Sequence, residues 1–177
     1  MKGQPLNIPT LTSKRLILEP ISLLHSKGMF DLWSSANVCK YSGEVKDSKG
    51  NIIEMPAKSS ADSDLIIEFW LQAAKDNWGF RWAILDLESR KFMGTIGFNS
   101  LTDCSEIAYH LIPKHWGKGI MTEASITAIA WSKTNGAHAI EAFVDPDNLK
   151  SILLLLRLGM TAGSDFSDGA QRYYMNI

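Results

Sequence analysis

The sequence predicts one α+β domain over residues 1–177, built on a mainly antiparallel mixed sheet of about six to seven strands flanked by about four helices. Two observations carry this prediction. First, 45% of the residues are apolar, and a chain of this length buries roughly two-thirds of its unfolded surface, which supports a substantial core. Second, the hydrophobic period changes along the chain between about 3.6 residues, typical of helices, and about 2, typical of strands.

The predicted elements follow one another in the order β-α-α-β-β-β-α-β-α-β-β. The strands are expected over residues 15–20, 80–86, 91–98, 106–112, 139–144, 161–166 and 172–177. The helices are expected at about 22–35, 62–77, 121–135 and 148–158. Short polar turns join the second, third and fourth strands, which indicates an antiparallel meander. This order differs from that of a doubly wound nucleotide-binding fold.

Local signals define several boundaries within this order. Residues 41–64 are polar and show no sustained period, so we expect a long loop or a small hairpin insertion there. Asp62 or Ser63 is the expected N-cap of the second helix. Gly136 and Gly159 are expected to end the last two helices.

Composition argues against several classes of function. The formal charge of -1 gives no net attraction to nucleic acid or to an anionic membrane. The longest apolar run, residues 152–156, is far shorter than the roughly 20 residues of a membrane span. We therefore expect a soluble, cytoplasmic protein that binds neither nucleic acid nor membrane. Cys39 and Cys104 lie far apart and the four histidines match no ligand motif, so we expect neither a disulfide nor a metal site.

The stretch HLIPKHWGKGIMTEA, residues 110–124, carries the strongest local signal. Glycines flank Lys118 between an apolar strand and a run of helix formers, a pattern typical of a phosphate-binding turn at a helix N-terminus. The GxxxxGK[ST] pattern fails because Ile112 and Pro113 lie where its first glycine would have to be, and Gly119 follows the lysine. GxGxxG fails because Thr122 replaces its third glycine. Ordinary nucleotide-binding folds are thus disfavoured.

This stretch resembles the acetyl-CoA signature of the GNAT superfamily of N-acetyltransferases, [QR]-x-x-G-x-[GA]. It matches at Gly119 and departs at Trp116 and Met121, where the ribosomal-protein alanine and serine N-acetyltransferases, the Rim group, commonly have the same residues. Further segments resemble that group in the same order along most of the chain: LTSKRLILEPIS, FMGTIGF, SEIAYHLIP and DPDNLKSILLLLRLGM. The resemblance implies a GNAT fold and an acetyl-CoA-dependent acyltransferase.

The resemblance also implies where acetyl-CoA, the acetyl donor, would bind. Its pyrophosphate would lie against the backbone N–H groups from about Trp116 to Thr122, and a backbone N–H of Leu111 or Ile112 would polarise the thioester carbonyl. Pro113, which has no N–H, fits a strand that stops pairing at this point. The residues expected to bind the donor are Leu111, Ile112, Trp116, Gly117, Lys118, Gly119, Ile120, Met121, Thr122 and Asn148.

Acetyl transfer requires a neutral amine. At pH 7 a lysine with a pKa of about 10.4 costs about 4.6 kcal/mol to deprotonate, whereas an α-amino group with a pKa of about 8 costs about 1.4 kcal/mol. The resemblance places Glu106 near the reaction as the catalytic base, acting directly or through water. Strand alternation puts His110 on the same face as a second candidate. A solvated carboxylate at Glu106 and a structural role for His110 are the alternatives.

The segment from Asp147 onward begins a helix and matches the family's N-x-x-S. The resemblance assigns Asn148 to the pantetheine arm and Ser151, the second expected catalytic residue, to the CoA sulfur. Helix capping by Asp147 or Asn148 is the alternative. Many GNAT enzymes have an acid tyrosine four residues after that serine, but Leu155 stands there. Arg157 is expected near the CoA phosphates or on the surface.

The acceptor is expected to be a protein or peptide N-terminal amine, and the protein a monomer or homodimer. A small amine such as a polyamine, an amino acid or an aminoglycoside is the alternative within the same fold. A non-catalytic acetyl-CoA-binding module is the alternative from another class. Of the aromatic residues, Trp70, Trp78, Trp82 and Trp131 are predicted in the core. Residues expected to line the acceptor groove are Phe30, Trp33, Tyr41 and Ser42.

Overall fold

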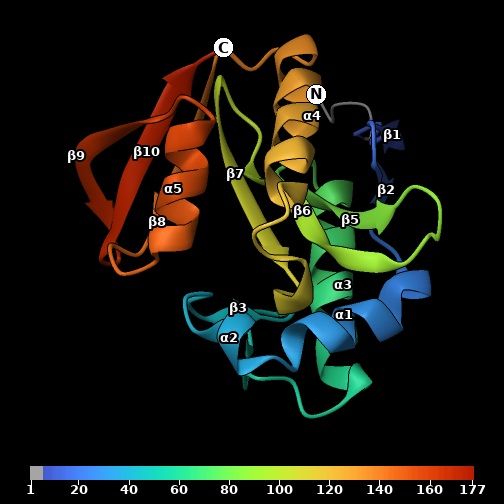
Figure 1. Cartoon of the computed structure of the whole chain (residues 1–177). Helices are drawn as coiled ribbons and strands as arrows, with labels where there is room; N and C mark the ends of the chain where they lie inside the picture. The colour runs from blue at the N-terminus through green and yellow to red at the C-terminus, as the bar shows by residue number, and fades with distance from the viewer. Residues whose placement is uncertain (1–5) are drawn as a thin grey trace.

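The computed structural model describes residues 6–177 and contains an eight-stranded mixed sheet with strand order β1-β2-β5-β6-β7-β8-β10-β9 (Figure 1). Its strands are β1 Leu11–Thr12, β2 Leu16–Pro20, β5 Phe80–Asp86, β6 Phe92–Ser100, β7 Cys104–Leu111, β8 Ala139–Val144, β9 Thr161–Ser167 and β10 Ala170–Asn176. A separate hairpin pairs β3 Val45–Lys46 with β4 Ile52–Ile53. The helices are η1 Leu23–His25, α1 Ser26–Trp33, α2 Ala36–Cys39, α3 Ser60–Lys75, η2 Pro113–His115, α4 Ile120–Thr134 and α5 Leu149–Arg157.

Each strand and helix predicted from the sequence is present, with small shifts at the ends. The first predicted helix is divided into η1 and α1, and the segment expected to be a loop or hairpin contains the β3–β4 hairpin. The short strand β1 enlarges the main sheet beyond the expected six to seven strands. The predicted cap of α3 was wrong. Ser59 is the N-cap, and Asp62 accepts hydrogen bonds from the backbone N–H groups of Ser59 and Lys58 at 3.0 and 2.9 Å.

The pairing between β7 and β8 is incomplete and leaves a gap in the main sheet. β7 and β8 run parallel and pair only over residues 104–106 and 139–141, whereas the other neighbouring strands run antiparallel. Beyond Glu106 the two strands diverge (Figure 1). The edge of β7 that follows Glu106 is consequently unpaired on the side facing β8, among the residues that the structure describes.

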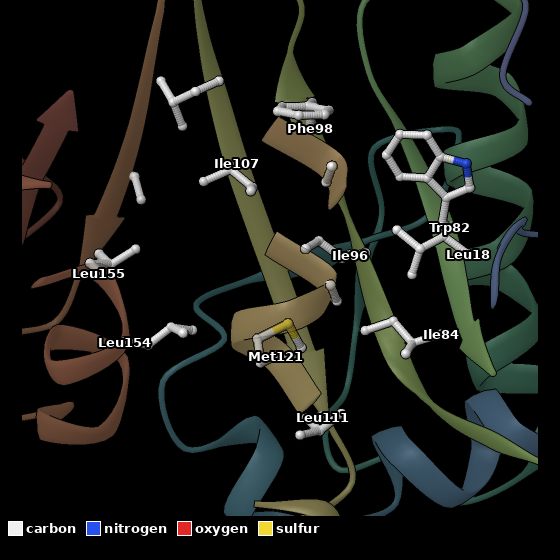
Figure 2. Packing of buried hydrophobic residues seen from close by; sticks show 14 of the residues in the cluster. Leu18, Trp82, Ile84, Ile96, Phe98, Ile107, Leu111, Met121, Leu154 and Leu155 are labelled. Atoms are coloured by element: carbon white, nitrogen blue, oxygen red, sulfur yellow. The ribbon is translucent and has the colours of Figure 1, made fainter. Parts of the chain in front are cut away.

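Two apolar clusters lie on opposite faces of the sheet. The larger one joins α4 and α5 to the sheet residues shown in Figure 2, including Trp82, Phe98 and Ile107. The smaller one joins α1 and α3 to the other face, through residues such as Leu32, Ile67 and Ala83. We call these the α4/α5 face and the α1/α3 face. Side chains of successive β7 residues point alternately to the two faces.

Three of the four tryptophans predicted in the core pack into or against it, and the fourth does not. Trp82 and Trp131 are buried in the α4/α5 cluster at 0% and 8% exposure, as predicted. Trp70 is partly buried, packs against the α1/α3 cluster and also lines a cleft. Trp78 was wrongly placed in the core, because it is 41% exposed and lines the same cleft. Trp78 lies after the end of α3 at Lys75, in the turn before β5, so no helical period sets the position of its side chain.

Candidate active site

A cleft of about 1670 Å³ surrounds the point where β7 and β8 separate. Its walls come from β7, the start of α4, the loop between β8 and α5, and the segment around α2 and β3. The Tyr41 hydroxyl donates a hydrogen bond to the Asp147 backbone oxygen at 3.2 Å, which joins two of these walls. Segments distant in the sequence thus enclose one site.

The predicted phosphate turn forms one end of this cleft. Gly117 and Gly119 have φ angles of +71° and +72°, in the left-handed region that favours glycine. Gly119 is the N-cap of α4, and no side chain of the described chain caps this helix start. The first N–H groups of a helix have no partner within it and lie at its positive dipole end. The turn is therefore suited to bind an anion, as expected for the pyrophosphate of CoA.

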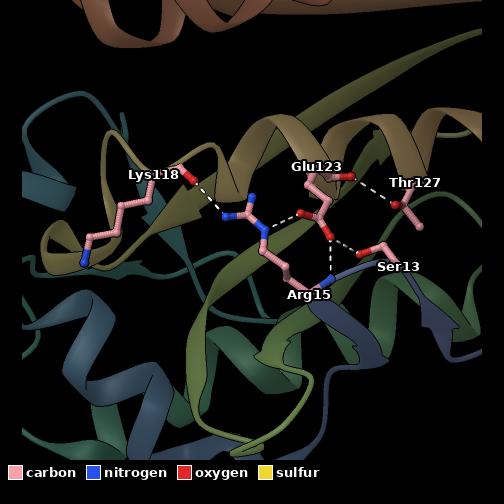
Figure 3. Close-up of polar contacts among 5 residues, drawn as sticks. All are labelled: Ser13, Arg15, Lys118, Glu123 and Thr127. Atoms are coloured by element: carbon pink, nitrogen blue, oxygen red, sulfur yellow. Dashed lines mark hydrogen bonds and ion pairs between the residues drawn. The ribbon is translucent and has the colours of Figure 1, made fainter.

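A set of hydrogen bonds that was not predicted from the sequence holds this turn against the segment between β1 and β2 (Figure 3). The Glu123 carboxylate accepts hydrogen bonds from the Ser13 hydroxyl, the Arg15 backbone N–H and the Arg15 Nε, each at 2.7 Å. Arg15 Nη1 also donates to the Lys118 backbone oxygen at 3.0 Å. The bond from Arg15 fixes the Lys118 carbonyl oxygen on the side away from the cleft. We therefore expect the N–H groups of the turn to face the cleft. The partners are more than 100 residues apart, so no local pattern reveals them.

The geometry distinguishes the two predicted donors to the thioester carbonyl. The Ile112 N–H donates to the Met93 oxygen at 2.9 Å and is therefore occupied. Leu111 lies opposite Gly94 in a pair without mutual hydrogen bonds, so its N–H points away from β6 toward the gap beside β8. Trp116 Nε1 donates to the Leu111 oxygen at 2.7 Å and fixes this part of the edge. Leu111 is thus the better placed of the two.

Glu106 lies on the α1/α3 side of the cleft in a chain of polar groups. Asn99 Nδ2 donates to a Glu106 carboxylate oxygen at 2.6 Å, and Arg81 donates to the Asn99 side-chain oxygen. The Arg81 guanidinium lies over the Trp70 ring at 3.5 Å, and the residue is only 4% exposed. Burial lowers the pKa of Arg81 to about 9, an effect that the charge of Glu106 opposes. Glu106 is thereby oriented by its neighbours rather than free in solvent.

His110 lies on the same face, with its ring 4.6 Å from that of Trp33. Burial, reinforced by the charge of Arg81, lowers the pKa of His110 to about 3. Its Nδ1 is buried and has no hydrogen-bond partner within residues 6–177. His110 is thus a neutral imidazole at physiological pH, whether it acts in the reaction or only supports the site.

The low pKa of His110 has a consequence for stability. Since the unfolded chain takes up a proton near pH 6.5 and the folded chain does not, stability should fall as the pH drops below 6.5. We expect a His110→Gln variant to show a shallower loss between about pH 6.5 and 5, where most carboxylates stay ionised. Denaturant unfolding of both proteins across this range tests the difference, and equal slopes would contradict it.

The start of α5 forms the wall opposite β7. The Asn148 side chain accepts a hydrogen bond from the Ser151 backbone N–H at 3.3 Å, so Asn148 is the N-cap of α5, and both residues line the cleft. Leu155 is fully buried. Arg157 lines the cleft and also a small cavity beside Gly119 and Thr122, near the phosphate turn.

The α1/α3 end of the cleft is aromatic. Trp33, Tyr41 and Ser42 line it as expected. Phe30 does not, because it packs into the α1/α3 cluster. Trp70 and Trp78 extend the same wall, together with the β3 residues that precede the hairpin turn.

The structure also describes the cysteines, the possible metal ligands and the lengths of the helices. Cys39 and Cys104 are free. Over residues 6–177, no group of three or more His, Cys, Asp or Glu side chains is arranged to hold a metal ion. No helix in that same range is long and apolar enough to cross a lipid bilayer.

Comparison with known proteins identifies relatives of this chain. The family model of the acetyltransferase (GNAT) domain matches residues 15–161. The uncharacterized N-acetyltransferase YoaA of Bacillus subtilis is 30% identical over 172 residues, covering 94% of this chain and 88% of that protein.

Two solved structures show the same fold with different acceptors in their descriptions. The ribosomal L7/L12 α-N-protein acetyltransferase RimL, in complex with coenzyme A, has a TM-score of 0.77 at 14% identity and covers 96% of this chain and 98% of its own. The spermidine N-acetyltransferase of Vibrio cholerae, in complex with CoA and spermine, has a TM-score of 0.72 at 19% identity, with coverages of 93% and 96%. At these identities the similarity establishes the fold and not the acceptor.

Proposed function

Because this chain belongs to the GNAT acetyltransferase family and is an acyltransferase, we propose that it transfers the acetyl group of acetyl-CoA to the N-terminal α-amine of a protein or peptide. The donor would bind with its pyrophosphate at the phosphate turn and its thioester at the unpaired edge of β7. The amine would enter from the α1/α3 face, beside Glu106. Attack on the thioester carbonyl would be direct, with the Leu111 N–H polarising the carbonyl oxygen.

The observation that carries the choice of acceptor is Arg81, a buried cation at the α1/α3 end of the cleft. A polyamine or an aminoglycoside brings several positive charges, and a buried guanidinium beside its path disfavours such a ligand. The cleft lining holds as many cations as acids, so it has no net negative charge that would attract a polycation. The cations are Arg81, Lys40, Lys46, Lys150 and Arg157, and the acids are Glu44, Glu106, Asp145, Asp147 and Asp168. A peptide N-terminus brings one titratable amine followed by carbonyl oxygens, which guanidinium N–H groups can bind.

Arg81 also supports one alternative, a free amino acid, whose carboxylate would pair with the guanidinium. Peptides with amidated C-termini separate the two acceptors, because they present an α-amine without a nearby carboxylate. A free amino acid used beside them presents both groups.

The test is thiol release from acetyl-CoA followed by mass spectrometry of the products. The acceptors are amidated peptides beginning with Ser, Ala or Met, together with spermidine, free amino acids and an aminoglycoside. We expect acetylation of a peptide α-amine with a kcat/KM at least about tenfold above that of any small amine. Acetylation confined to a small amine, or acetyl-CoA binding without turnover on any acceptor, would overturn the proposal.

A further inference from the structure

Tyr109 has a hydroxyl group that the fold leaves without a partner. The side chain comes from β7 and packs against the α4/α5 cluster, while the residue also lines the cleft. Its hydroxyl oxygen is buried and makes no hydrogen bond within the part of the chain that the structure describes. Buried tyrosine hydroxyls normally find a partner, so an unpaired one in a cleft indicates a ligand atom that completes it.

The groups around the Tyr109 hydroxyl indicate which ligand atom would pair with it. The Ser151 hydroxyl is near enough to act on the pKa of Tyr109. The Leu111 N–H, two residues along the same strand edge, points into the same gap. Tyr109 and Ser151 therefore lie beside the place where a thioester held by the Leu111 N–H would have its sulfur.

The opposite faces of β7 carry different groups. Glu106 and His110 contact residues of the α1/α3 face, such as Asn99 and Trp33. Tyr109 contacts the α4/α5 face. An acetyl transfer needs a proton acceptor on the side of the amine and a stabilising donor on the side of the leaving thiolate. The α1/α3 face of β7 carries the candidate proton acceptors Glu106 and His110, and the α4/α5 face carries the candidate donor Tyr109.

We propose that Tyr109 is a catalytic residue whose hydroxyl, together with that of Ser151, donates a hydrogen bond to the sulfur of CoA as the carbon–sulfur bond breaks. In this step the amine nitrogen forms its bond to the carbonyl carbon, and the electron pair of the breaking bond passes to sulfur. The nitrogen loses its proton to Glu106 or to water. The thiolate later takes up one proton from water, so that the reaction releases CoA thiol and an amide.

The acidity of Tyr109 agrees with a hydrogen-bond donor. Burial raises the pKa of Tyr109 to about 12, an effect that the Ser151 hydroxyl opposes. The phenol therefore remains protonated at any physiological pH. A thiol has a pKa of about 8.5, so its thiolate is a weaker base than the phenolate and accepts the hydrogen bond without taking the proton. Leu155 offers no hydroxyl from α5, so the hydroxyl groups of α5 and of β7 beyond Glu106 are those of Ser151 and Tyr109.

The first experiment compares Tyr109→Phe with the wild type, using acetyl-CoA and whichever acceptor of the panel reacts best. We expect kcat to fall at least about tenfold, because a donor to a developing charge is lost while the Ser151 hydroxyl remains. The Kd of acetyl-CoA should change less than twofold. Tyr174→Phe is the matched control, because Tyr174 lies on β10 outside the cleft and its loss should leave kcat unchanged. Since the Tyr109 hydroxyl makes no hydrogen bond within residues 6–177, the variant should unfold at the same or a higher denaturant concentration.

The second experiment needs no acceptor, so it judges this proposal even if the proposed acceptor is wrong. The ultraviolet absorbance of the thiolate is titrated with pH for CoA bound to the wild type and to Tyr109→Phe. We expect the pKa of the bound thiol to be higher in the variant, because a donor that stabilises the thiolate is gone. An unchanged thiol pKa, or an unchanged kcat, would overturn the proposal, which rests on the acetyl transfer but not on the nature of the amine.

Discussion

Replacing Glu106 by glutamine is expected to lower kcat about 100- to 1,000-fold, the usual contribution of a positioned general base. Glutamine retains an oxygen that can accept the hydrogen bond now made by Asn99 Nδ2 at 2.6 Å, so the site should keep its shape. The variant loses only the ability to take a proton from the attacking amine. Glu106 lies on the face of β7 opposite the proposed donor site, so the affinity for acetyl-CoA should not change.

Single-turnover rates and calorimetric titration with acetyl-CoA measure the two quantities separately. Glu88→Gln is the matched control, because Glu88 is exposed in the turn after β5 and the same chemical change there should affect neither quantity. A wild-type rate for Glu106→Gln would show that water or His110 removes the proton. In that case the role of Glu106 would be only to hold Asn99 in place by accepting its hydrogen bond.

Replacing Gly119 by alanine is expected to weaken acetyl-CoA binding about tenfold. The φ angle of +72° at this residue costs a non-glycine residue roughly 1–2 kcal/mol, and each 1.4 kcal/mol is a factor of ten. An added Cβ would meet only the Arg15 guanidinium at 3.5 Å, so the effect comes from backbone strain and not from a clash. Relief of that strain would turn the N–H groups at the start of α4 away from the cleft.

Gly136 provides the control at the other end of the same helix. It has a φ angle of +95° and open space around its added Cβ. Gly136→Ala should lower the stability of the fold by a similar amount and leave acetyl-CoA affinity unchanged. Calorimetry and denaturant unfolding of both variants make the comparison. Equal affinities of Gly119→Ala and the wild type for acetyl-CoA would show that the phosphate turn is not part of the binding site.

The sequence alone predicted the features that depend on residues close to one another along the chain. Hydrophobic period and turn residues predicted the strand and helix order, and the glycines flanking Lys118 predicted a helix start open to an anion. The family resemblance then predicted the acetyltransferase, which the family comparison confirms.

The features that were missed depend on contacts between distant segments. Arg15 and Glu123 meet across 108 residues. Arg81, Asn99 and Glu106 come together only because β5, β6 and β7 are adjacent in the sheet. The role proposed for Tyr109 depends on the separation of β7 and β8, which no residue pattern predicts. The error at Trp78 arises because this residue lies in the turn between α3 and β5, where no periodic pattern indicates whether a side chain is buried.

A crystal structure of the protein with bound CoA tests the central claim most directly, because it shows where the donor lies relative to the two faces of β7. The Trp116 N–H donates to the Pro113 oxygen at 3.0 Å, so the range expected from the sequence narrows by this residue. We expect the pyrophosphate against the N–H groups of residues 117–122 and the arm in the gap between β7 and β8. The sulfur should lie within hydrogen-bond distance of the Tyr109 or Ser151 hydroxyl. An arm outside that gap, or a sulfur on the side of Glu106, would contradict the account.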